Sequence, residues 1–189
     1  MENKELQYFR LFRDVCKVIN STLNLEEVLK LITENVVNVL NVKACTIFLL
    51  DTVENRLKVS ASYGLTEAYL KKGPIDADKS IPEVLEGKPV LIIDAQNDPR
   101  IQYPKEKAEE GIASILSVPI SVKAKVIGVL RIYTSQPRKF SDDESEFISG
   151  LAEMGGIAID NARMHDHLKA DHERLINEVH RWFEFGRTT

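Results

Sequence analysis

The hydrophobic positions at the start of the chain recur with the period of an α-helix. Between Leu6 and Ile19 they fall three or four residues apart, which predicts an amphipathic helix. The same period returns over residues 25–41 after a polar interruption, and Asn24 is placed to cap this second helix with Glu27 at the matching third position. We therefore expect two N-terminal helices, each with one apolar face.

The next segments have the patterns of strands. Ala44–Leu50 is almost continuously apolar, and Arg56–Tyr63 alternates apolar and polar positions. Residues 51–55 between them predict a turn. We expect a hairpin whose second strand has one face in water.

An irregular stretch over residues 66–113 carries scattered prolines and glycines. Within it the pattern predicts a short strand at Val90–Ile93 and a short helix at Lys105–Glu110. A long mixed connection inside a compact domain is usually a binding loop or a lid. Two apolar, β-branched runs follow, Ile115–Ile120 and Val126–Tyr133, and their short charged connection predicts a second hairpin.

The last part of the chain predicts one long helix. Ser141 followed by Glu144 is a capping box, and nothing then stops a helix before Gly186. Seam positions alternate by four and three residues over five heptads, which predicts a dimeric coiled coil. The alternative is that this face packs on the first helix of the same chain. The seam consists of Phe147, Leu151, Met154, Ala158, Asn161, His165, Leu168, His172, Leu175, Val179 and Trp182.

The order of these elements predicts an α+β fold. It is an antiparallel sheet with the N- and C-terminal helices packed on one face and a ligand-pocket region on the other. We divide the chain into an N-terminal bundle helix at 1–22, a domain at 23–160 and a coiled-coil-like helical extension at 161–189.

Composition and charge remove several function classes. The net charge is −4, whereas a nucleic-acid surface would normally show a basic excess. No apolar run approaches the ~20 residues of a membrane span, and the charged N-terminus has no signal-peptide core, so we expect a cytoplasmic protein. Cys16 and Cys45 are far apart and do not form the closely spaced pair of a zinc or thioredoxin-like motif. The sequence also contains no recognisable set of catalytic or metal-binding residues. We expect neither an enzyme nor a metal protein.

The motifs together resemble a GAF domain, the small-molecule sensor module of signalling proteins. The resemblance covers about Leu23–Ala162 and rests on NSTLNLEEVLKLI, ACTIFLLD, GKPVLIIDAQNDPR, SILSVPISVKAKVIGVLRIYTS, FSDDE and LAEMGGIAIDNA, in family order. It implies a GAF/PAS-like fold. It leaves the cofactor unknown, because this fold binds many kinds of ligand.

Four ligand classes of the family lose support from departures in this sequence. The Asn-Lys part of the cyclic-nucleotide constellation is missing at Ser135-Gln136-Pro137, and the irregular stretch has no cysteine for a bilin. All four histidines lie in the terminal helix, away from any haem pocket. Of the cysteines that methionine-sulfoxide-reducing relatives need in the pocket, only Cys45 is a candidate.

Arg131 is the first candidate for ligand contact. On its strand Val129, Arg131 and Tyr133 share one face, while Gly128, Leu130 and Ile132 form an apolar face that suits helix packing. A partly enclosed guanidinium binds a carboxylate or phosphate in bidentate geometry. Its partner is either an anionic ligand or an aspartate of the chain, Asp94 or Asp98; the other alternative is that it reaches solvent.

Further candidates surround Arg131. By the register of the family, Ser117, Cys45 and Ile47 would face the same side. Asp94 either orients a ligand or caps the following turn, and Ser117 either contacts a ligand or bonds to backbone. Tyr63, Tyr103 and Tyr133 form an aromatic wall or simply pack in the core. The candidate ligand-binding residues are Arg131, Tyr133, Ser117, Asp94, Cys45 and Tyr103.

The sequence thus predicts a sensory or regulatory module of a signal-transduction protein, such as a two-component system. It would bind a small ligand, for which an anion is favoured, and signal as a homodimer through its terminal helices to an output domain or partner. Two alternatives remain open: a ligand-free dimerisation module, and a small redox enzyme that uses Cys45.

Overall fold

A six-stranded antiparallel sheet forms the centre of the molecule. The computed structural model describes residues 4–22, 24–80 and 82–185. The strands lie in the order β3-β2-β1-β6-β5-β4, so that β1 and β6 occupy the middle. They are β1 Ala44–Asp51, β2 Arg56–Tyr63, β3 Ile75–Asp76, β4 Val90–Ile92, β5 Ser114–Val122 and β6 Lys125–Thr134.

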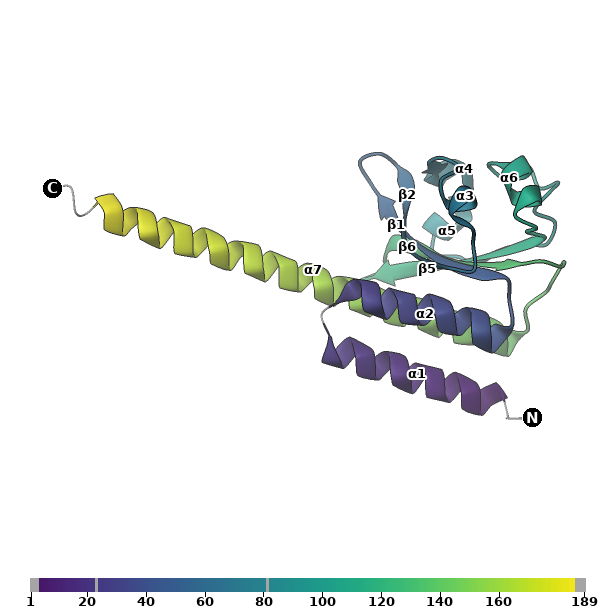
Figure 1. The fold of residues 1–189 in the computed structure, drawn as a ribbon, viewed down its shortest axis with the longest axis horizontal. Coiled ribbons are helices and arrows are strands. Elements are labelled where there is room, and N and C mark those ends of the chain that lie inside the picture. Colours follow the sequence, from purple (N-terminus) through teal and green to yellow (C-terminus); the bar gives the residue numbers. More distant parts are fainter. Residues whose placement is uncertain (1–3, 23, 81, 186–189) are drawn as a thin grey trace.

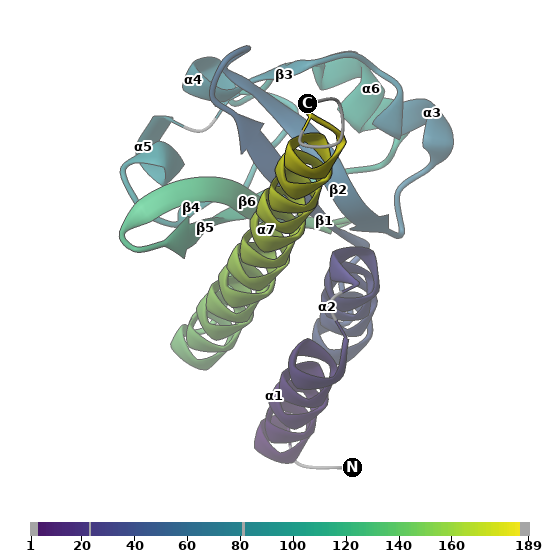
Figure 2. The same cartoon turned by 90° about the vertical axis from the view of Figure 1, so that its left-hand side faces the viewer.

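Helices cover the two faces of this sheet unequally. Three long helices, α1 Lys4–Ser21, α2 Leu25–Leu40 and α7 Asp142–Phe185, lie on one side (Figures 1 and 2). The opposite side carries only single-turn or two-turn helices: α3 Glu67–Leu70, α4 Ala77–Ser80, α5 Pro82–Leu85 and α6 Pro104–Glu109. The predicted α+β fold is confirmed.

Both predicted helix starts have the expected caps. The Asn24 side chain accepts a hydrogen bond from the Glu27 N–H at 3.4 Å. At α7 the capping box is complete, since Ser141 Oγ accepts from the Glu144 N–H at 3.2 Å and Glu144 Oε2 accepts from the Ser141 N–H at 3.1 Å. Arg138 ties this start to the end of α2, donating to Leu40 O at 2.9 Å and to Glu144 Oε1 at 2.7 Å.

The main core lies between the sheet and the three long helices. Leu130 and Ile132 of β6 are fully buried there, as the face assignment for this strand predicted. At the far side of the helical layer, Phe147 of α7 stacks on Tyr8 at 3.9 Å between ring centroids and meets Phe12 edge-on at 5.3 Å. Because α1 contributes both rings, it is part of the same packed layer.

Two glycines of α7 let this helix approach its neighbours closely. A Cβ on Gly156 would lie 2.7 Å from Ser121 O on β5, and a Cβ on Gly150 would lie 2.7 Å from the Phe12 ring. Glycine weakens a helix interior by roughly 1 kcal/mol. At Gly156 the close approach to the backbone of β5 requires glycine, whereas at Gly150 an added Cβ would meet only the far end of the Phe12 side chain.

The predicted heptad seam divides into two halves. Phe147, Leu151, Met154 and Ala158 are buried inside the chain, on the helical face of the sheet. From Asn161 onward α7 leaves the domain as a single projecting helix (Figure 1). Its apolar seam residues are exposed there, and the Trp182 side chain is outside the described residues. The exposed members are Leu168, Leu175 and Val179.

None of the helices in the described part of the chain combines the length and the apolar character that a bilayer span requires.

The turn between β5 and β6 places two ordinary residues in the left-handed region. Lys123 has a φ of 49° and Ala124 a φ of 62°. A two-residue hairpin turn of this kind favours Asn-Gly, because glycine adopts positive φ without steric cost. The present residues therefore hold some backbone strain.

We expect the double substitution Lys123→Asn, Ala124→Gly to raise the free energy of unfolding by about 1 kcal/mol, because it relieves this strain. Urea unfolding followed by circular dichroism measures the change. Val53→Gly, at an exposed turn position with no positive φ, is the matched control and should bring no gain. A double variant no more stable than wild type would contradict the argument.

Candidate functional site

The second face of the sheet is covered by residues 66–113, apart from 81, which we call the cover segment. Its helices α3, α4, α5 and α6 lie across this face (Figure 2). Two small apolar clusters attach it to the strands. In one, Tyr69 packs on Tyr133; in the other, Val84 packs near Phe48 and Val129. Between the clusters lies a group of polar side chains.

The cover segment is braced by hydrogen bonds within itself. The backbone of Asp76 donates to the Gln102 side chain at 3.1 Å and accepts from it at 2.8 Å. The Tyr103 hydroxyl donates to Pro74 O at 2.8 Å, and Thr66 Oγ1 donates to Glu110 Oε2 at 2.5 Å. These contacts join the part before β3 to the part around α6, so the cover behaves as one unit.

Arg131 lies beneath this cover at the centre of the sheet. The side chain is buried, and its Nη2 donates to Ser80 Oγ of α4 at 2.6 Å. Its guanidinium carbon lies 5.6 Å from the centre of the Phe48 ring, within cation–π range. Its Nε–H is buried and has no hydrogen-bond acceptor among the described residues. Arg131 is thus an enclosed cation with unused hydrogen-bonding capacity.

Tyr133 is a second buried donor on the same face. Its hydroxyl lies near the side chains of Thr46 and Arg131 but makes no hydrogen bond of good geometry within the described residues. Burial raises the pKa of Tyr133 to about 12, although nearby Arg131 opposes the shift, so the hydroxyl stays protonated near neutral pH. Tyr69 of α3 meets its ring edge-on, with centroids 6.3 Å apart.

Two lysines of the cover segment complete the group. Lys72 follows α3, donates to Tyr69 O at 3.1 Å and lies over the Tyr69 ring at 3.6 Å. Lys107 of α6 is buried and donates to Gln102 O. Burial, and after it the charge of Arg131, lowers the pKa of both lysines, to about 8 for Lys72 and about 7 for Lys107. Lys72 lowers the pKa of Lys107 as well.

The structure places three of the predicted site residues as the sequence suggested. Arg131 and Tyr133 share the face opposite the helical core, and Ser117 pairs with Arg131 across the β5–β6 ladder, so it lies on that face too. Tyr103 belongs to the cover segment as a brace. Whether any of them contacts a ligand stays a prediction.

The aspartates proposed as partners of Arg131 are engaged elsewhere. Asp94 is exposed and caps its own turn, accepting from the Gln96 N–H at 3.1 Å and from the Asn97 side chain at 2.7 Å. Asp98 pairs with Arg100 at 2.7 Å. The interpretation that Asp94 or Asp98 neutralises Arg131 is therefore wrong, and the turn-capping alternative for Asp94 is confirmed.

The prediction that Cys45 and Ile47 share the face of Arg131 is also wrong. Cys45 pairs with Ile132 and lies in the helical core, whereas Thr46 pairs with Arg131. Strand β1 is buried on both faces, so its apolar pattern does not define which side chains point to which face. The register assumed from the family placed its residues on the wrong face by a shift of one position. Tyr63 pairs with Cys45 and is partly exposed, so it forms no wall of this site.

Sequence reasoning missed Lys72, Lys107, Tyr69, Ser80 and Thr46. The first four lie in the irregular stretch, where no periodicity assigns a face. Thr46 alone carried a signal in the sequence, since it is a polar residue inside an apolar strand. In the structure it pairs directly with Arg131.

Comparisons with known proteins agree on one family. The family model described as GAF domain matches residues 22–160. The methyl sulfide methyltransferase-associated sensor of Methanosarcina acetivorans is 30% identical over 168 residues, which are 85% of this chain and 17% of that protein. The formate hydrogenlyase transcriptional activator of Salmonella typhimurium is 22% identical over 93% of this chain and 26% of its own length. This chain therefore spans between 17% and 26% of the length of these relatives.

A solved structure supports the same fold. The GAF domain of a phosphoenolpyruvate-protein phosphotransferase from Coxiella burnetii superposes with a TM-score of 0.75 and 24% identity. The match covers 86% of this chain and 98% of that domain.

The buried lysine should leave a signature in the pH dependence of stability. The unfolded chain keeps the Lys107 proton up to its ordinary pKa of 10.5, whereas the folded protein releases it near 7. Between these values the unfolded state binds more protons, so stability rises with pH across this window. Arg131, Lys72 and Glu106 are the charged groups that act on Lys107.

We expect Lys107→Met to be more stable than wild type by about 1–2 kcal/mol at pH 7, and this advantage should shrink toward about pH 9.5. The lost hydrogen bond to Gln102 O offsets part of the gain. Urea unfolding at the two pH values measures both quantities. Lys105→Met, at an exposed position of the same helix, is the control and should not alter the pH slope. A destabilised Lys107→Met with an unchanged slope would contradict this picture.

Proposed function

The chain belongs to the GAF domain family, a sensory module of signalling proteins, and we propose that it binds a small ligand between β6 and the cover segment. We propose further that it signals as a homodimer through its terminal helices. The remainder of the signalling protein, or a partner, would supply the output, and the domain itself would not be a catalyst.

One observation carries the ligand proposal. The Arg131 Nε–H and the Tyr133 hydroxyl are both buried on the same face, and neither makes a hydrogen bond of good geometry among the described residues, although the two side chains lie close to each other. An unmade hydrogen bond of a buried donor costs roughly 1–3 kcal/mol, and more for a charged group. Two such donors under a braced cover favour a site built to receive acceptor atoms, which fits a ligand with an anionic group.

The fold supplies a short path from this site to the helices. Arg131 faces the cover, while Leu130 and Ile132, its neighbours on the same strand, pack against the helical layer. The loop after β6 then carries Arg138, which contacts the end of α2 and the start of α7. A shift of β6 on ligand binding would therefore act on the base of the helix that projects from the domain.

The projecting half of α7 supports the dimer proposal. Leu168, Leu175 and Val179 are more than half exposed and lie four or seven residues apart on one helix face. A lone helix that leaves such residues in water gains stability by pairing with a second copy.

The redox alternative loses support from the position of Cys45. Its side chain is fully buried in the helical core, on the opposite side of the sheet from Arg131. Burial raises the pKa of the thiol well above its ordinary value, so the reactive thiolate is disfavoured. The ligand-free dimerisation module remains as the second candidate, because the exposed seam alone supports it.

Native mass spectrometry of protein purified gently from its own host tests the ligand proposal. We expect a mass excess from a retained small molecule in wild type and its loss in Arg131→Gln. Arg56→Gln removes an exposed arginine of the neighbouring sheet region and should retain the ligand. Wild-type protein that never carries or takes up a small molecule would favour the ligand-free module.

Sedimentation velocity over a dilution series tests the dimer. We expect Leu168→Glu combined with Leu175→Glu to raise the dimer dissociation constant by about 100-fold, because four carboxylates would meet in the seam. Lys169→Glu, on the same exposed stretch but outside the seam, is the control. Equal dissociation constants for the seam variant and wild type would rule out pairing through this helix.

A further inference from the structure

We infer that the ligand of this site carries at least two negative charges and is held jointly by Arg131, Lys72 and Lys107. This deepens the proposed function and rests on it, because it names the chemical class of the molecule that the site takes. The shared chemistry is that of carboxylate, phosphate or sulfate oxygens on one small molecule.

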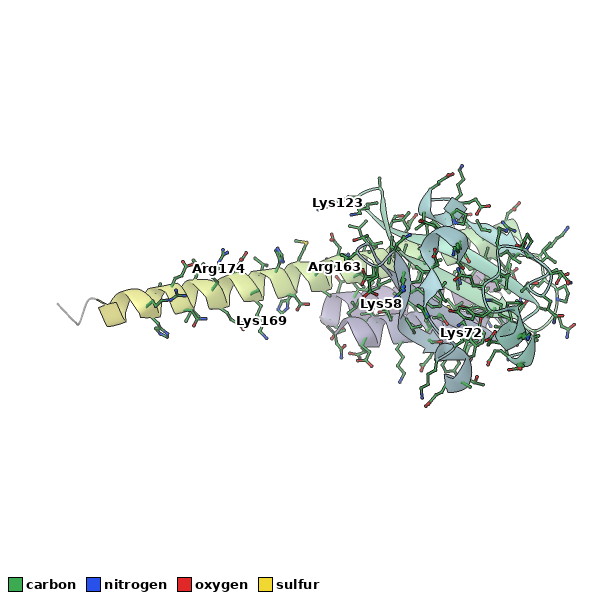
Figure 3. All side chains as sticks on the ribbon, turned by 90° about the horizontal axis from the view of Figure 1, so that it is seen from above. Lys58, Lys72, Lys123, Arg163, Lys169 and Arg174 are labelled. Atoms are coloured by element: carbon green, nitrogen blue, oxygen red, sulfur yellow. The ribbon has the colours of Figure 1, made fainter. Side chains whose placement is uncertain are left out.

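Three separate elements bring these cations together. Arg131 comes from the middle of β6, Lys72 from the residues after α3, and Lys107 from α6. The rings of Tyr69 and Tyr133 connect the positions, since Lys72 lies on Tyr69 and Tyr69 packs edge-on against Tyr133. Figure 3 labels Lys72 on the globular part of the molecule, whereas Arg163, Lys169 and Arg174 extend from the projecting helix.

No carboxylate within the described ranges forms an ion pair with any of the three. Asp98 is taken by Arg100, and Glu144 by Arg138. Glu110, one of the two glutamates whose charge acts on Lys72, accepts from Thr66 and pairs with Lys43 at 3.9 Å. Buried cations are normally paired or hydrogen-bonded to acceptors, so this arrangement leaves positive charge without compensation.

The three cationic groups of the site can only donate hydrogen bonds, whereas the Tyr133 hydroxyl can donate or accept. Arg131 offers its Nε–H, Tyr133 its hydroxyl proton, and the two ammonium groups their remaining protons. A neutral ligand that carries donors as well as acceptors would place some of its donors against the cationic donors of the site. A carboxylate, phosphate or sulfate accepts only, and its oxygens match the fork of a guanidinium.

The number of cations in the group, three without an ion-pair partner among the described residues, indicates the required charge. Burial and the neighbouring positive charges lower the pKa of Lys107 to about 7 and that of Lys72 to about 8. The other charged or titratable groups facing them are Glu106, Glu110, Tyr69 and Tyr133, and the two glutamates only partly offset the shift. One negative charge would balance Arg131 alone. A ligand with two or more would also restore the protonated lysines.

Binding should therefore take up a proton. Near pH 7.5 the Lys107 ammonium is partly deprotonated in the free protein, and a bound anion favours its charged form. Affinity should then fall as the pH rises, by up to about tenfold per pH unit for one linked proton. The ligand probe must not titrate itself, which sulfate and succinate satisfy in this range.

Isothermal titration calorimetry at constant ionic strength provides the test. Sulfate stands for phosphate-like groups and succinate for dicarboxylates, with acetate as the monoanion and succinamide as the neutral analogue. We expect sulfate or succinate to bind at least about tenfold more tightly than acetate, and succinamide not to bind. Whichever of sulfate and succinate binds more tightly identifies whether the site prefers phosphate-like groups or carboxylates.

Matched variants assign the binding to the three cations. Lys72→Gln and Lys107→Gln should each weaken dianion binding by about tenfold or more, and Arg131→Gln should abolish it. Lys71→Gln and Lys105→Gln remove exposed neighbours of the two lysines and should bind like wild type. Titrations in triethanolamine and in Tris, two cationic buffers that differ in ionisation enthalpy, count the protons. We expect uptake in wild type and less in Lys107→Gln.

The outcomes separate this inference from the function on which it rests. Preferred dianion binding that is lost in the cation variants supports it. If acetate or succinamide binds as tightly as the dianions, or Lys72→Gln and Lys107→Gln bind like wild type, the charge assignment is overturned while a ligand site remains. If no probe binds and native mass spectrometry also finds no ligand, both proposals fail.

Discussion

The burial of β6 on both of its faces is the constraint on which the rest of the structure depends. One face presents Leu130 and Ile132 to the helical layer, and the other presents Arg131 to the cover segment. A charge in the middle of a sheet requires either an acid beside it or a layer that supplies acceptors. Among the described residues Arg131 donates to Ser80 Oγ and lies near the Tyr133 hydroxyl, so the covered face is not a simple second core.

The cover segment encloses Arg131 although its backbone is mostly irregular. It has few regular elements, yet side-chain contacts such as Gln102 with Asp76 and Tyr103 with Pro74 hold its two parts together. The same unit carries Lys72 and Lys107, and burial together with the charge of Arg131 lowers the pKa of both. If the site binds an anion as proposed, occupancy would stabilise the cover through charge rather than through apolar area.

Local patterns predicted most of the fold, whereas the site was predicted only in part. Helices, hairpins and the Ser141 cap follow from periodicity and capping within a few residues. Arg131 could be assigned a face because it contrasts with an apolar strand. Cys45 could not, since both faces of β1 are buried and a one-residue slip exchanges them. Lys107 is flanked by charged residues in PKEKAE, and its burial results from long-range packing that no local pattern encodes.

Because α7 is one continuous helix, a small tilt at its base would move its far end by a larger distance. It begins at a cap held by Arg138 and Glu144, packs over its first half, and then extends without support (Figure 1). At 1.5 Å per residue, the part beyond Asn161 measures about 37 Å, so a tilt of about 5° at its base displaces the tip by about 3 Å. If β6 shifts on ligand binding as proposed, a small tilt at the base of α7 would thus be magnified several-fold at the far end of the helix.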